Sequence, residues 1–109
     1  METATLLNRL LDVTEQDILP LTRAGVADGN KLFGAAILRK RDLALVVAAT
    51  NNETENPLWH GEMHAIRKFY EIPAADRPPP GECLFLATHE PCSLCLSGIT
   101  WSGFDNFYY

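Results

Sequence analysis

Two apolar runs separated by a short charged segment place the strongest constraint on the fold of this 109-residue chain. Phe33–Leu38 and Leu43–Ala49 flank Arg39-Lys40-Arg41-Asp42, a pattern typical of a β-hairpin. Neither run alternates apolar and polar residues, so we expect both strands to be buried on both faces. The sequence therefore predicts a hairpin that lies inside the protein rather than at its surface.

The segments around this hairpin have the patterns of helices and further strands. The predicted elements are, in chain order, a helix over 4–28 with an interruption at Pro20, a helix from near His60 to before Pro73, a strand over 83–88, a helix over 91–103 and the start of a strand at 107. Thr14 is expected to cap the second half of the first helical region. Met63, Ile66 and Tyr70 are expected to share one stripe of the next helix. The final strand–helix–strand unit implies a parallel pair with a right-handed crossover.

Charge and hydropathy narrow the possible partners. The net charge is −5, and the one basic cluster, Arg39-Lys40-Arg41, is interpreted as a solvated turn rather than an anion site. Nucleic acid is therefore not expected as the main partner, because nonspecific binding to phosphates depends on Lys and Arg. The longest apolar run is too short to cross a bilayer, and the N-terminus lacks the basic region of a signal peptide. We expect a cytoplasmic protein without a membrane segment.

Three side chains have the chemistry of zinc ligands. Cys92 and Cys95 are three residues apart in the first turn of a predicted helix, where they share a face and the helix dipole stabilises thiolates. His60 begins another predicted helix. Zinc binds imidazole and thiolate in a tetrahedron, and three protein ligands leave the fourth position for water. The spacing therefore predicts a catalytic rather than a structural zinc site.

Glu62 follows His60 by two residues, a separation that points two side chains in nearly opposite directions in the middle of a helix. Both can face one ion only if the ion lies beyond the N-terminal end of that helix. We therefore expect His60 and Cys92 at facing helix starts, with Glu62 beside a zinc-bound water. A carboxylate there can take the water's proton and pass it on.

These residues carry a resemblance to a known family. His60-Gly61-Glu62 and Pro91-Cys92-Ser93-Leu94-Cys95 form a His-x-Glu … Pro-Cys-x-x-Cys signature, and the chain over roughly 24–109 resembles the zinc-dependent cytidine/deoxycytidylate deaminase superfamily. The motif form is most similar to the branch of cytosine, guanine and tRNA-adenosine deaminases. Phe33-Gly34-Ala35-Ala36-Ile37 is similar to the family's first strand.

The resemblance implies a fold and a reaction. The expected fold is a three-layer α/β/α sandwich with a mixed sheet, like that of cytidine deaminase. His60, Cys92 and Cys95 would bind Zn²⁺, and zinc-bound hydroxide would attack the amino-bearing ring carbon of a nucleobase or nucleoside. Glu62 would shuttle protons, and ammonia would be released. Phe33, Asn51 and Trp59 are the candidate substrate contacts.

The chain also departs from its relatives. Leu58-Trp59 replaces the small or hydroxylated pair that often precedes the histidine, so Trp59 is expected to reshape the pocket. We interpret residues 1–109 as a single deaminase domain without the family's C-terminal strand and helices. A homodimer is the expected assembly. Cys83, His89 and Trp101 are assigned to packing or to the surface.

Four other interpretations stay open on the sequence. The chain could be the subunit of a tRNA adenosine deaminase that takes its basic surface from elsewhere, or a non-catalytic scaffold held together by zinc. His64, one turn after His60, could complete a structural site of two cysteines and two histidines. Cys92 and Cys95 alone would also suit a redox pair.

Overall fold

The predicted hairpin forms two of the three strands of the sheet, and its first strand is the central one. In the computed structural model, which describes residues 2–109, β1 (Gly34–Arg39) pairs antiparallel with β2 (Leu45–Thr50) and with β3 (Cys83–Ala87). The strand order is β2-β1-β3. Tyr108 adds a parallel bridge to Leu86, which makes the sheet mixed and agrees with the predicted parallel unit at the end of the chain.

Burial differs between the two strands of the hairpin. β1 is the middle strand, and its residues from Gly34 to Leu38 are all buried, as predicted. β2 lies at the edge of the sheet, where Val46 and Ala48 are only partly buried. The prediction of burial on both faces is therefore wrong for β2. Within residues 2–109, no further strand lies beyond it, so its side chains lack the neighbours that would cover them from that side.

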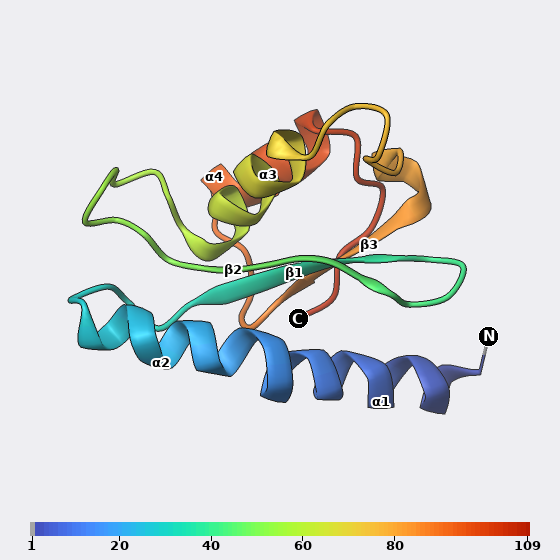
Figure 1. Cartoon of the computed structure of the whole chain (residues 1–109), viewed down its shortest axis with the longest axis horizontal. Coiled ribbons are helices and arrows are strands. Elements are labelled where there is room, and N and C mark those ends of the chain that lie inside the picture. Colours follow the sequence, from blue (N-terminus) through green and yellow to red (C-terminus); the bar gives the residue numbers. More distant parts are fainter. Residues whose placement is uncertain (1) are drawn as a thin grey trace.

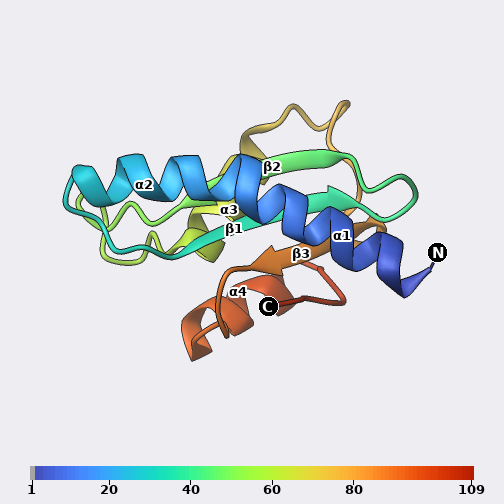
Figure 2. The ribbon, with the colours of Figure 1, turned by 90° about the horizontal axis from the view of Figure 1, so that it is seen from below.

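A long N-terminal helical rod covers one face of the sheet (Figures 1 and 2). It consists of α1 (Thr3–Val13), a π-helical turn (Thr14–Ile18) and α2 (Leu19–Ala27). Thr14 has helical backbone angles, and its hydroxyl donates to the Leu10 carbonyl, so it is not the predicted cap. Pro20 lacks an N–H and its ring would crowd a regular helix; the wider turn before it lets the helix continue.

The opposite face of the sheet carries α3 (Gly61–Glu71) and α4 (Ser93–Trp101), so the predicted three-layer α/β/α architecture is confirmed (Figure 1). One apolar core fills the space between these helices and the sheet, and a second lies under α1. On α3 the innermost aromatic residue is Phe69, which is fully buried, whereas Tyr70 is 44% exposed. The prediction that Tyr70 shares the buried stripe with Met63 and Ile66 is therefore wrong, because the neighbouring residue Phe69 takes the buried position.

The proline-rich segment before β3 ends in a short 3-10 helix over Pro80–Glu82. It carries the chain from the end of α3 back to the sheet. Within residues 2–109, none of the helices has the length and apolar character that a bilayer crossing would need.

Candidate active site

Two helix starts meet at one edge of the molecule and bring the predicted ligands together. His60 and Cys92 are the residues immediately before α3 and α4, and both have extended backbone. His60 Nδ1 lies 3.5 Å from Cys92 Sγ and 3.4 Å from Cys95 Sγ, and the two sulfur atoms are 3.6 Å apart. Elements more than thirty residues apart in the sequence therefore place one nitrogen and two sulfur donors in a triangle.

This triangle matches the size of a tetrahedral zinc site. With Zn–S near 2.3 Å and Zn–N near 2.0–2.1 Å, tetrahedral angles put two sulfurs about 3.8 Å apart and a nitrogen and a sulfur about 3.6 Å apart. All three separations are close to these values, and the donors are of the types that zinc prefers. Among residues 2–109, His60, Cys92 and Cys95 are the one group of three such side chains close enough to hold a metal ion.

The surroundings of Cys95 also fit a bound cation. Burial raises the pKa of the Cys95 thiol, and the nearby Glu62 carboxylate raises that pKa further. A thiol in such a place resists ionisation unless a positive charge sits beside it. A coordinated metal supplies that charge and deprotonates its thiol ligands.

Glu62 is the most unusual polar group at the site. Its side chain is 1% exposed, and neither carboxylate oxygen has a hydrogen-bond partner among residues 2–109. A buried carboxylate without partners costs free energy, so its presence indicates a functional demand rather than a contribution to stability. The Glu62 carboxylate contributes to the raised pKa of the Cys95 thiol.

Phe33 and His89 form an aromatic wall next to Glu62. Their rings are 4.0 Å apart between centroids, with an angle of 33° between the planes. His89 Nε2 lies 3.9 Å from Glu62 Oε2. Sequence reasoning assigned His89 to packing or to the surface. Its position two residues after the end of β3 and three residues before Cys92 could have indicated a place at the site.

Asn51 secures the start of α3. Its side chain is buried, and Oδ1 accepts a 2.7 Å hydrogen bond from the Gly61 N–H. The neighbouring Asn52 instead donates its side-chain amide to Glu55. Asn51 thus satisfies one of the N–H groups that a helix start leaves without an intrahelical partner.

The side chain of Trp59 contacts Arg67 of α3, whose guanidinium carbon lies 5.1 Å from the indole centroid. Arg67 also pairs with Glu55 at 2.9 Å. These contacts hold the half-buried indole against the loop that precedes the helix.

His64 lies one turn beyond His60 but is engaged elsewhere. Its Nδ1 donates a 2.9 Å hydrogen bond to the Thr50 carbonyl. The group of donor atoms close enough to share one ion consists of His60, Cys92 and Cys95 and does not include this ring, so the described residues do not form the four-ligand structural site considered from the sequence.

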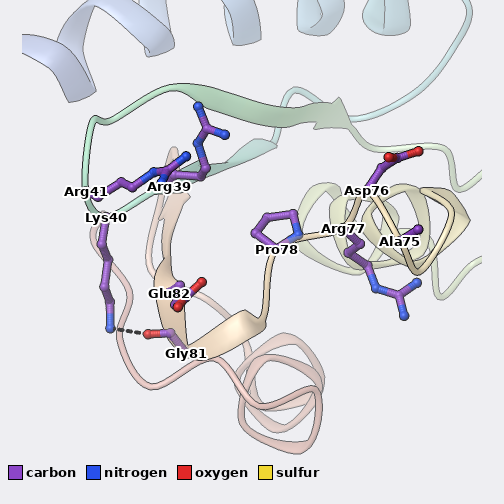
Figure 3. A pocket seen from close by; sticks show the side chains of 9 residues that line it. All are labelled: Arg39, Lys40, Arg41, Ala75, Asp76, Arg77, Pro78, Gly81 and Glu82. Carbon is purple, nitrogen blue, oxygen red and sulfur yellow. Dashed lines mark hydrogen bonds between the residues drawn. The ribbon is translucent and has the colours of Figure 1, made fainter.

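A separate pocket of about 570 Å³ lies between Arg39–Arg41 and the proline-rich segment before β3 (Figure 3). Much of its positive charge is already paired. Arg39 forms an ion pair with Asp42 at 2.7 Å, and Lys40 Nζ lies 2.9 Å from Asp105 and also donates to the Gly81 carbonyl. None of the predicted site residues lines this pocket.

The fold and the site together define a class: an α/β/α protein with a mixed sheet, a His-Cys-Cys donor set at two helix starts and a buried glutamate beside it. The sequence profile of the family described as "Cytidine and deoxycytidylate deaminase zinc-binding region" matches residues 12–109. The chain belongs to this family. The predicted superfamily is thereby confirmed, and zinc is the metal that this region binds in the family.

Individual relatives agree with this assignment. Guanine deaminase of Bacillus subtilis (strain 168) is 35% identical over 72 residues, which span 64% of this chain and 44% of that protein. The solved structure of guanine deaminase from Bacillus subtilis matches 100% of this chain and 64% of its own, with a TM-score of 0.71 and 28% identity. Guanine deaminase from Nitrosomonas europaea matches 83% of this chain and 52% of its own, with a TM-score of 0.64 and 26% identity.

A solved structure from a study of tRNA:A34 deaminases shares the fold as well. It has a TM-score of 0.70 and 24% identity over 84% of this chain and 68% of its own. The present chain spans less than two thirds of the length of the Bacillus subtilis guanine deaminase that it matches.

Proposed function

We propose that this protein is a zinc-dependent hydrolytic deaminase of a small nucleobase or nucleoside. The observation that carries the proposal is the Glu62 carboxylate, buried and without partners, beside the triangle of His60, Cys92 and Cys95. A metal site that served stability alone would have no use for an unpaired carboxylate at this position.

The residues of the site have two separate functions in this proposal, metal binding and proton transfer. His60, Cys92 and Cys95 would hold zinc, which when bound acts as a Lewis acid and lowers the pKa of a water molecule to about 7. Glu62 Oε1 and Oε2 are free to accept a proton from water and to return it to the substrate. In the overall reaction a C–O bond forms at the amino-bearing ring carbon, the C–N bond breaks, and ammonia leaves.

Phe33 and Asn51 have different parts in this proposal. The Phe33 ring offers an apolar face to a planar base. Asn51 Oδ1 is occupied by Gly61, so a contact of Asn51 with substrate would use its amide nitrogen. We propose Trp59 as the outer boundary of the pocket, held in place by Arg67.

The similarity to guanine deaminases makes free guanine the first substrate to test. The net charge of −5 opposes binding to a nucleic-acid backbone, and ion pairs already occupy Arg39 and Lys40 of the one basic cluster in the sequence. We therefore propose a small molecule rather than a tRNA as substrate. A homodimer and a cytoplasmic location stay predictions.

Ammonia release from zinc-loaded protein tests the function. The panel covers guanine, adenine and cytosine, with their nucleosides and nucleotides. We expect at least one of them to be deaminated, and Glu62→Ala to keep its zinc while its rate falls about 100-fold or more, because general acid–base catalysis contributes that much.

Glu71→Gln is the matched control, since Glu71 is an exposed carboxylate on the same helix. Its rate should equal that of the unaltered chain. A zinc-loaded chain that is inactive on the whole panel would support the scaffold interpretation instead, and activity confined to tRNA would support the polynucleotide one.

A further inference from the structure

We propose that His89 is a positioning residue for Glu62: its Nε2–H orients the carboxylate. The inference rests on the proposed function, since it assigns Glu62 its proton-transfer role. It adds a residue that the signature motif does not contain.

The first support is the direction in which the imidazole faces. His89 Nε2 lies 3.9 Å from Glu62 Oε2, and neither oxygen of that carboxylate has a hydrogen-bond partner among residues 2–109. The separation is longer than a hydrogen bond but shorter than the width of an intervening water. Catalytic hydrogen bonds are commonly this long without substrate and shorten in the reactive complex.

The second support is that the ring is held on two sides. One face of the imidazole stacks on Phe33 at 4.0 Å, and Nδ1 lies 3.4 Å from the Thr88 hydroxyl oxygen. Thr88 and Phe33 are themselves fixed by β1 and its neighbours: the Thr88 N–H donates to the Gly34 carbonyl, and the Asn51 N–H donates to the Phe33 carbonyl. Nε2 is the ring nitrogen that remains to face the site.

The third support concerns the position of the proton. The Thr88 hydroxyl oxygen accepts a 3.1 Å hydrogen bond from the Gly34 N–H, so its own hydrogen is free to donate to His89 Nδ1. A neutral imidazole that accepts at Nδ1 carries its proton on Nε2. With the Thr88 hydroxyl as donor to Nδ1, the chain from Gly34 through Thr88 to His89 ends in an Nε2–H that lies 3.9 Å from a carboxylate oxygen without a partner in the described part of the chain.

Two variants separate this role from a purely structural one. His89→Phe keeps a ring to stack on Phe33 but has no N–H, and His89→Gln restores an amide N–H on a side chain of similar reach. For His89→Phe we expect unchanged zinc content and melting temperature, a KM within about threefold, and a kcat lowered about 10- to 100-fold, the range for partners that orient the groups of a metal site. His89→Gln should recover part of kcat.

A spectroscopic test does not require activity. In ¹⁵N-histidine NMR spectra of the zinc-loaded protein, the His89 signals are those that disappear in His89→Phe. We expect a neutral ring protonated at Nε2, whose Nε2 signal shifts in Glu62→Gln. Thr88→Val should move part of the proton to Nδ1.

Each contrary result is recognisable. An increase in KM without a change in kcat would make His89 a substrate contact, and a fall in zinc content or melting temperature would make it structural. A ring protonated at Nδ1, or one that does not respond to Glu62→Gln, would also overturn the assignment. If no substrate is deaminated, the proposed function fails, while the NMR result still decides whether His89 donates to Glu62.

Discussion

At the scale of single residues, the site combines two buried groups, each of which costs free energy when it has no partner of opposite charge. Cys95 is a buried thiol whose pKa is raised by burial and by Glu62, and Glu62 is a buried carboxylate without partners. A zinc ion between them would offset both costs, because it provides the positive charge that each lacks. The same residues would be a liability in a chain that bound no metal.

A cysteine pair tests this dependence. Cys95→Ser should reduce bound zinc from one ion per chain to a small fraction, because a serine hydroxyl is a far weaker zinc ligand than a thiolate. Cys83→Ser is the matched control: Cys83 is also buried, but it lies in β3 outside the donor triangle. Metal analysis after gel filtration measures both. Equal zinc loss in the two variants would contradict the ligand set.

Residue chemistry also explains what the sequence could and could not predict here. Histidine and cysteine spacing was sufficient to bring His60, Cys92 and Cys95 together, because both helix starts follow directly from motif and capping patterns. His89 was missed because its role depends on Phe33 and Glu62, which lie on other elements. A local sequence pattern cannot predict a contact between residues that lie on different elements.

At the scale of elements, the site depends on how closely the start of α3 approaches β1. A Cβ atom on Gly61 would lie 2.8 Å from Gly34 Cα and 2.9 Å from the Phe33 carbonyl oxygen. Both neighbours are backbone atoms of the central strand region and cannot rotate away. Gly61 therefore fixes the position of the two residues that flank it, His60 and Glu62.

Gly61→Ala should consequently displace the helix start. We expect a loss of about 1–3 kcal/mol in the free energy of unfolding, the usual cost of overpacking, together with weaker zinc binding. Gly81→Ala is the control, since a Cβ there meets no atom within 4 Å. Urea denaturation and competition with a chromogenic chelator provide the two measurements. If Gly61→Ala behaves like Gly81→Ala, the close approach does not constrain the site.

Element boundaries show where local sequence patterns stop being sufficient. Pro20 predicted an interruption, but the helix continues through a π-helical turn because the apolar side of the rod packs along the sheet. Continuous apolar character predicted burial for both hairpin strands, yet β2 is at the edge. The position of each strand in the sheet depends on where β3 pairs, and the sequence of the hairpin alone does not determine that pairing.

At the scale of the whole molecule, the metal site and the folded core are largely separate. Two apolar cores on the two faces of the sheet hold the layers together, and neither contains a residue of the donor triangle. Cys95 is buried at the start of α4 but lies outside both cores. Zinc would instead link the starts of α3 and α4, which are otherwise joined by packing such as that of Gly98 against Met63.

This separation predicts how the protein responds to metal removal. With a chelator, the chain should still unfold in one cooperative transition, but at a lower temperature. Zinc at a free concentration one hundred times its Kd adds about 2.7 kcal/mol to the free energy of unfolding, which for a domain of this size corresponds to a shift of roughly 10–20 °C. Circular dichroism melts with chelator and with buffered zinc measure the shift.

In the control variant His60→Ala, the melts with chelator and with zinc should nearly coincide, because zinc cannot link the two helix starts without this ligand. Complete loss of secondary structure on chelation would mean that the sheet and its cores cannot persist without the ion. Zinc would then have to be counted among the forces that hold the fold together.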